Sequence, residues 1–70
     1  MSVRYDPEAD AAYIPIGREP RTGEAEQQIA EIRNPSGTGE IILDFDRDGH
    51  LIGVEILEAS RLLRAEDLTG

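Results

Sequence analysis

Residues 40–57 constrain the fold more than any other part of the chain, because they read as two strands joined by a tight turn. Two runs rich in β-branched and aliphatic residues, 40–46 and 50–57, flank Arg47, Asp48 and Gly49. An Asp-Gly pair between such runs is a strong hairpin signal. The segment therefore predicts an antiparallel β-hairpin with Asp48-Gly49 as a two-residue loop.

The side chains of this hairpin can be assigned to faces, because directly opposed residues in an antiparallel pair share a face. In the two-residue-loop register, Arg47 opposes His50, Asp44 opposes Gly53 and the apolar residues oppose one another. One face then receives Ile41, Leu43, Phe45, Ile52, Val54 and Ile56. The other receives Asp44, Asp46, Gly53 and Glu55, with Ile42, Leu51 and Leu57 among them. A slip of one residue would mix the two sets, so we predict one apolar and one mostly polar face.

The first 16 residues predict a second, weaker strand pair. Val3 and Tyr5 alternate with polar neighbours, and Asp6 and Pro7 suit the N-cap and first position of one or two helical turns over residues 7–11. Residues 12–16 then read as a strand. Pro15 cannot donate to a ladder, so we expect this strand to lie at an edge or to carry a bulge there.

The remaining segments are read from turn residues and helix formers. Residues 17–23 contain Gly17, Pro20 and Gly23 and predict a loop. Residues 24–32 follow neither period cleanly; we assign a strand, because residues 34–39 look like a connection between strands. Residues 58–65 predict a short helix with Leu62 or Leu63 against the sheet, followed by a tail, 66–70, that frays.

Together these segments predict a single domain, residues 1–70, of the α+β class. The predicted sheet is small and antiparallel, with about four to five strands, hairpin 40–57 at its centre and a short C-terminal helix. With 70 residues the chain buries a modest core, and with no cysteine it has no disulfide. Self-association is the commonest remaining way to stabilise so small a domain, so we expect a homodimer.

Charge narrows the possible partners. The chain has 15 acidic and 7 basic residues, a formal net charge of −8. Such a field repels phosphate backbones and anionic membranes, so neither nucleic acid nor membrane is an expected partner. It attracts a basic protein or a cation. No apolar run approaches a membrane span and no signal peptide is evident at the N-terminus, so we expect a cytoplasmic protein.

Three segments of the chain, residues 3–14, 41–49 and 51–60, resemble a bacterial and archaeal family, domain of unknown function 2283. The similarity includes the opening Tyr5-Asp6-Pro7-Glu8-Ala9-Asp10 and the Asp48-Gly49 hairpin. The resemblance implies a small α+β fold with an antiparallel sheet and a short helix, and no established activity. Family members often lie beside genes that resemble ribonuclease-type toxins, which implies an antitoxin-like role.

A cation-binding reading of the hairpin stays open as an alternative. Residues 44–55 match the calcium-loop pattern, with Asp44, Asp46 and Asp48 at positions one, three and five, a glycine at six and Glu55 at twelve. An EF-hand needs a helix on each side of its loop, whereas both flanks here read as strands. We therefore interpret the aspartates as the solvated side of a strand and its turn, and predict no metal site.

Residue types used in catalysis are present, but their spacing selects no site. His50 is the only histidine, and Ser2, Ser36 or Ser60 could each be drawn into a triad with it. The acidic cluster Asp6, Glu8 and Asp10 is accounted for by capping and turn chemistry. Residues 37–42 begin like a dinucleotide-binding loop but lack the third glycine and precede a strand. We predict no catalytic residues and no cofactor.

Three functions follow, in order of preference. The first is a non-catalytic, acidic interaction module that binds a basic protein such as a toxin. The second is a cation-binding or metal-dependent hydrolytic protein that uses Asp44, Asp46, Asp48 and His50. The third is a structural subunit without a ligand.

Overall fold

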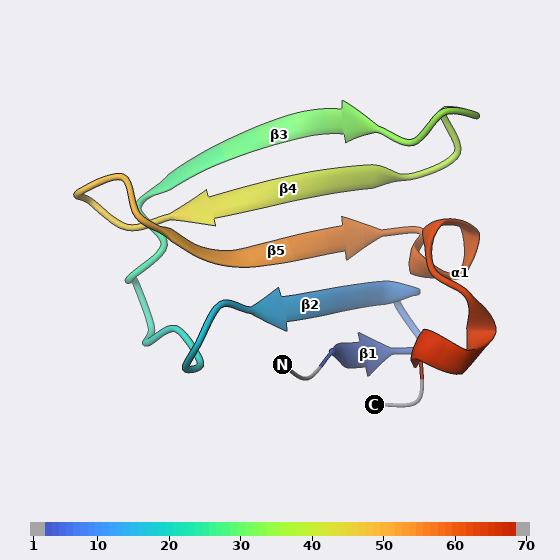
Figure 1. The fold of residues 1–70 in the computed structure, drawn as a ribbon, viewed down its shortest axis with the longest axis horizontal. Coiled ribbons are helices and arrows are strands. Elements are labelled where there is room, and N and C mark those ends of the chain that lie inside the picture. Colours follow the sequence, from blue (N-terminus) through green and yellow to red (C-terminus); the bar gives the residue numbers. More distant parts are fainter. Residues whose placement is uncertain (1–2, 69–70) are drawn as a thin grey trace.

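Five strands pair into one antiparallel sheet, with the order β1-β2-β5-β4-β3, in the computed structural model, which describes residues 3–68 (Figure 1). The strands are β1 Arg4–Asp6, β2 Ala11–Pro15, β3 Gln27–Arg33, β4 Glu40–Phe45 and β5 Leu51–Leu57. A short helix α1, Ala59–Leu62, and a 3-10 helix η1, Ala65–Leu68, follow β5. The predicted α+β class, the strand number and the central position of the β4–β5 hairpin are confirmed.

The register of the β4–β5 hairpin is as predicted over most of its length and differs near the turn. Asp44 pairs with Gly53 and Leu43 with Val54, as the alternation of side chains requires. Next to the turn, Phe45 pairs with Leu51 instead of Ile52, because a bulge shifts the register there. The predicted two-residue loop is therefore wrong.

The turn itself is longer than a two-residue loop. The amide of Gly49 donates to the carbonyl of Asp46, and the amide of Asp46 donates to the carbonyl of His50. Gly49 is the left-handed residue that follows the turn, with a φ of 84°. A glycine adopts this conformation at little steric cost, and a turn followed by such a residue is a common hairpin connection. Because this connection uses one more residue than a two-residue loop, β5 absorbs the difference as its bulge.

The N-terminal strand pair is present, but the helical turns predicted over residues 7–11 are wrong. Residues 7–10 form a turn, and β2 already begins at Ala11. Asp6 still caps this turn, because its Oδ1 accepts a 3.0 Å hydrogen bond from the amide of Glu8. The pairing of β1 with β2 therefore forms a short hairpin.

Pro15 occupies the place in β2 where a missing N–H matters least. The pairing of β1 with β2 ends at Tyr13, so β2 continues beyond β1 at Pro15. The amide of Ile16 bonds to the carbonyl of Ile52, which makes the adjacent pair, Pro15 and Gly53, a non-hydrogen-bonded one. The nitrogen of Pro15 thus faces away from β5, on the side where β1 has ended. The expectation that this strand lies at an edge or carries a bulge is wrong for β2 as a whole, which lies between β1 and β5 with a regular register.

Strand β3 carries the second irregularity. Ile29 pairs with Leu43 and Ile32 pairs with Ile41, so two residues of β3 stand opposite one residue of β4. Glu31 has a φ of 66° at this bulge, and its amide donates to the carboxylate of Glu40 at 2.9 Å. The bulge turns Ile29 and Ile32 toward the same face although three positions separate them.

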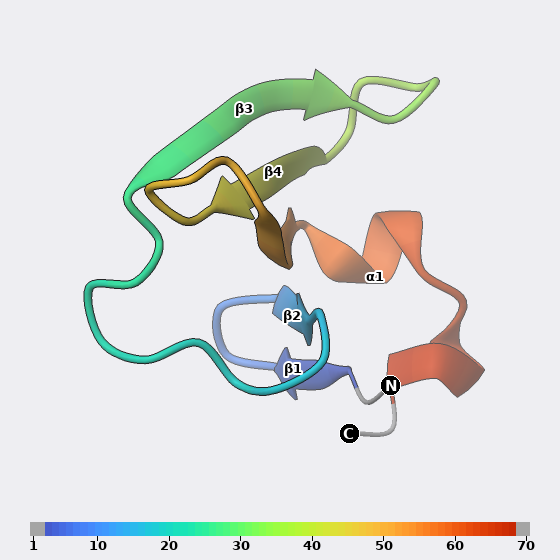
Figure 2. The same ribbon diagram turned by 60° about the vertical axis from the view of Figure 1, so that its left-hand side comes forward.

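The core lies where α1 meets one face of the sheet. Ala12, Ile56 and Ala59 are buried, and both Leu62 and Leu63 pack against them, which confirms the predicted contact of the helix. Figure 2 shows α1 beside the ends of β2 and β5, while β3 extends away from it. No large side chain is fully buried in the described part of the chain. The core is therefore small and confined to one end of the sheet.

Asp10 joins the first hairpin to α1. It has a φ of 50°, and its carbonyl accepts the amide of Ala59 at 2.9 Å. Its carboxylate accepts the amide and the hydroxyl of Ser60 at 3.0 and 2.7 Å, and the Tyr5 hydroxyl at 2.8 Å. The start of α1 is thus capped by a residue that lies far away in the sequence.

No described helix has the length and apolar character needed to cross a membrane.

Candidate functional site

The polar face of the sheet holds a pair of carboxyl groups on neighbouring central strands. Asp44 of β4 is buried, with 4% of its surface exposed, and Glu55 of β5 is half-buried. The side-chain amide of Gln28, on β3, donates to Asp44 at 2.8 Å and to Glu55 at 3.3 Å. Burial, the charge of Asp44 and a hydrogen bond with Asp44 together raise the pKa of Glu55. The negative charge of these two carboxyl groups is therefore not balanced by a neighbouring positive charge.

The ring of Tyr13 covers the backbone beside this pair. A side chain at Gly53 would collide with the Tyr13 ring and hydroxyl, so the ring lies against the glycine. Arg4 stacks on the same ring, 5.0 Å from its centroid, and its Nε bonds to Glu19 at 3.0 Å. Burial and the negative charges of Asp44 and Glu55 raise the pKa of Tyr13.

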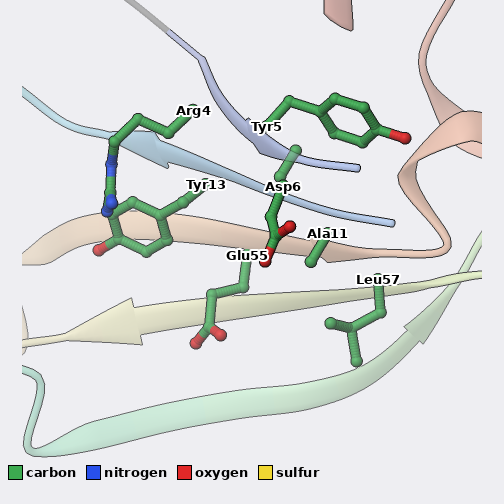
Figure 3. A pocket seen from close by; sticks show the side chains of 8 residues that line it. Arg4, Tyr5, Asp6, Ala11, Tyr13, Glu55 and Leu57 are labelled. Atoms are coloured by element: carbon green, nitrogen blue, oxygen red, sulfur yellow. The ribbon is translucent and has the colours of Figure 1, made fainter. Parts of the chain in front are cut away.

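A hollow of about 270 Å³ opens on this face over β1, β2 and β5. Figure 3 shows Arg4 above Tyr13 on one side, with Asp6 directed over Ala11 and Leu57 on the far side. Glu55 contributes its stem to the hollow and extends from β5 toward β4. The hollow thus combines apolar walls with carboxylates, which is the composition of a small recognition pocket.

A second group of ionisable side chains lies in the β4–β5 turn. Asp46, Asp48 and His50 each offer one atom that could ligate a metal, and these three atoms lie within 4.8 Å of one another. The Oδ1 atom of Asp46 accepts the amides of Asp48 and His50 at 3.0 and 2.9 Å, and its Oδ2 lies 3.3 Å from the His50 ring. These hydrogen bonds, with that of the His50 amide as the largest cause, lower the pKa of Asp46. Asp46 therefore organises the turn.

The four residues of the calcium-loop alternative fall into two places. Asp46 and Asp48 lie in the turn with His50, whereas Asp44 and Glu55 lie on the polar face of the sheet. The segments on both sides of the turn are strands, as the hairpin reading predicts. The prediction that no metal binds here stays a prediction.

The serines considered for a triad have other hydrogen-bond partners or lie outside the described residues. Ser36 bonds to Asn34 and Thr38 within the connection between β3 and β4. Ser60 bonds to Asp10, and the His50 ring bonds to Asp46. Ser2 lies outside the described residues. The structure brings none of the described serines into a hydrogen bond with His50.

The acidic cluster Asp6, Glu8 and Asp10 also separates. Asp6 borders the hollow and caps the turn, and Asp10 lies against α1. Hydrogen bonds from Ser60 and Tyr5 lower the pKa of Asp10. Sequence reasoning missed this link, although Tyr5, Asp10 and Ser60 all lie in the segments on which the family resemblance was drawn.

The hollow was also missed, because it is built by residues from three strands. Arg4, Tyr13 and Glu55 are far apart in sequence, and only the pairing of β2 with β5 brings Tyr13 opposite Glu55. No local signal points to the hollow, because the cover of Gly53 by Tyr13 can be recognised only once β2 is known to lie beside β5.

Comparisons with known proteins give one result. No curated protein and no solved structure matches the chain. The model of one family, described as "Protein of unknown function (DUF2283)", matches residues 2–60, so the chain belongs to this family.

Proposed function

We propose that the protein is a non-catalytic interaction module whose polar sheet face binds a basic protein. The observation that carries the proposal is the charge of this face. Asp6, Asp44 and Glu55 all lie there, and none of them is paired with a basic side chain among residues 3–68. Arg4, the basic residue in the lining of the hollow, is already engaged by Glu19 and Tyr13.

The raised pKa of Glu55 supports the same proposal. A carboxyl group whose pKa is raised by burial and by a neighbouring negative charge is one that a nearby cation would stabilise in its ionised form. A lysine or arginine side chain of a partner would lay its aliphatic stem along Leu57 and bring its charge to Asp6 and Glu55. Binding would then lower the pKa of Glu55 and release protons at mildly acidic pH.

The antitoxin-like role implied by the family resemblance is one form of this interaction. A basic enzyme that acts on nucleic acid carries a positive surface, and an acidic face of this kind competes for it. In this form of the proposal the protein covers the basic surface and has no catalytic residue of its own.

A titration with a basic peptide tests the proposal. Oligolysine is added to the protein in a calorimeter at low and at physiological salt, with the variants Glu55→Gln, Asp6→Asn and Glu8→Gln. Each variant removes one negative charge, but Glu8 lies in the exposed turn outside the lining of the hollow. We expect Glu55→Gln and Asp6→Asn each to weaken binding about tenfold, a typical effect of losing one charged hydrogen bond. Equal weakening by all three variants would show only bulk attraction and would overturn the site.

Capture from the native host gives a second test. The tagged protein and its Glu55→Gln variant are purified from host lysate at low salt. A basic protein retained by the parent and lost from the variant supports the proposal. If the parent emerges with no basic protein, the proposed function is wrong.

The cation-binding or hydrolytic alternative has weaker support. The oxygens of Asp46 already accept hydrogen bonds from two backbone amides and lie beside the His50 ring. A metal held by Asp46 and His50 would have to replace the contact between the Asp46 Oδ2 atom and the His50 ring. Calcium titration by calorimetry distinguishes the two proposals. A cation-binding protein gives a heat of calcium binding, whereas the interaction module is expected to give none.

A further inference from the structure

The apolar face of the sheet contains two rows of side chains that cross the strands. The first row runs through Tyr5, Ala12, Ile56, Ile41 and Ile32, which are direct neighbours on all five strands. Ala59 and Leu62 of α1 pack on the middle of this row, where Ala12 and Ile56 are buried. The middle of the first row is therefore the part of the face that the chain covers by itself.

The second row is left open. It consists of Ile14, Val54, Leu43 and Ile29, direct neighbours on β2, β5, β4 and β3. None of the four is buried, and 53% of the surface of Ile29 is exposed. Figure 1 shows α1 and η1 at the end of the sheet where β5 runs into α1. Ile14 and Val54 touch the edge of the core, whereas Leu43 and Ile29, at the other end of the row, lack a second layer, which sheets in stable domains normally have.

We infer that the open row packs against the same row of a second copy of this chain, in a two-fold symmetric dimer. This inference does not depend on the proposed function, because the open row lies on the opposite face from Asp6, Asp44 and Glu55. The occupant is argued from three observations: the charge of the row, the exposed area of the chain and the size of its core.

Charge favours a contact limited to this row. Each chain carries a net charge of −8, so two copies repel each other unless they meet where neither is charged. The open row contains no charged side chain and is the same on both copies, as a two-fold interface requires. A basic partner, by contrast, would gain nothing electrostatic from this row.

Area supports the same occupant. The chain exposes 4859 Å², whereas a folded monomer of its mass, 7.7 kDa, exposes about 4,300 Å². The excess, about 560 Å², approaches the roughly 800 Å² that each partner buries in a standard interface. Packing of the two open rows would remove part of this excess from solvent.

The small core explains why the second copy is the occupant that a chain of this kind needs. The described part of the sheet has no fully buried large side chain, and the chain has no cysteine for a disulfide. Such a sheet needs a covering layer from a molecule that is always present with it. Only another copy of the same chain meets that condition. Packed face to face, two sheets about 10 Å apart would bury both rows between them.

The oligomeric state tests the inference. By light scattering we expect twice the 7.7 kDa chain mass at micromolar concentration. The variant Ile29→Lys should give the monomer mass, because it places a charge in the most exposed position of the row. Leu57→Lys is the matched control, since Leu57 is 37% exposed on the polar face and the chemical change is the same. A monomeric parent, or an Ile29→Lys variant that stays dimeric, would overturn the inference.

Cross-linking covers the case in which Ile29→Lys does not fold. The chain has no cysteine, so Leu43→Cys and Ile42→Cys each introduce a single thiol on opposite faces of β4. A short bismaleimide should link Leu43→Cys into dimers at low protein concentration and leave Ile42→Cys as single chains. Equal linking of both variants, or linking of neither, contradicts the open row as the interface.

Discussion

At the scale of single residues, Asp10 determines how the two ends of the chain meet. Its carbonyl and carboxylate accept hydrogen bonds from Ala59, Ser60 and Tyr5, so one residue holds both the start of α1 and the first strand. The short helix has no side-chain cap of its own. A residue that looks like part of an acidic surface is therefore a structural one.

We expect Asp10→Ala to lower the thermal midpoint of unfolding, because α1 and Tyr5 lose their common acceptor. The pKa of Asp10 is lowered below 3.8 in the folded protein, so its stabilising effect is present above that pH and is lost as the pH falls through the folded value. Thermal unfolding at pH 7 and pH 3 checks this, with Glu8→Ala as the control. A difference between Asp10→Ala and parent that persists unchanged at low pH contradicts the role of the charge.

Glu55 has the opposite pH dependence. Its pKa is raised above 4.5 in the folded protein, so ionisation disfavours the folded state as the pH rises through the folded value. We expect Glu55→Gln to be more stable than the parent at pH 8, and the gain to disappear below pH 4.5, where both states of the parent are protonated. Denaturant unfolding at the two pH values measures this. A constant difference at both would show that packing, not charge, separates the variants.

At the scale of elements, the hairpin was predictable and the bulges were not. Alternation over residues 40–57 correctly assigns Ile41, Leu43, Val54 and Ile56 to one face. Ile29 and Ile32 fit no strand period, because the bulge between them inserts one residue and returns both to that face. The alternation of apolar and polar residues predicts regular strands well. A bulge interrupts that alternation, so a strand that contains one is not recognised from it.

The candidate site was out of reach of the sequence for a related reason. The hollow depends on the placement of β2 beside β5, and nothing in the local sequence of Tyr13 or Glu55 specifies that partner. The acidic residues 6, 8 and 10 were visible as a cluster, but their separation onto different contacts follows from the turn at residues 7–10 and the left-handed Asp10. Composition identified the charge of the site, and topology determined its shape.

The contact of α1 with β4 gives a prediction at this scale. Gly39 precedes β4, and a Cβ there would lie 2.8 Å from the carbonyl oxygen of Leu57 and would overlap the Leu62 side chain. We expect Gly39→Ala to destabilise the protein by about 1–3 kcal/mol, the usual range for overpacking. The double variant Gly39→Ala, Leu62→Ala should not recover the parent value, because the Leu57 carbonyl still obstructs the new methyl group. A Gly39→Ala variant as stable as the parent would show that α1 moves away at little energetic expense.

At the scale of the whole molecule, the −8 charge acts on stability as well as on binding. The four ion pairs between arginine and carboxylate side chains within residues 3–68 are at the surface, where each contributes little. Self-repulsion among the remaining carboxylates should therefore outweigh them, and salt should screen it. We expect the thermal midpoint to rise from low to physiological ionic strength. A midpoint that falls as salt is added would mean that the ion pairs dominate.

The strand order has a consequence for the time at which the chain can fold. β2 is made early, yet its neighbour across the sheet is β5, which ends at Leu57. On the ribosome, that edge of the first hairpin stays unoccupied until residues 51–57 have emerged, and Asp10 must wait longer still for Ser60. We therefore expect the first hairpin to remain without its partner strand until β5 has been made.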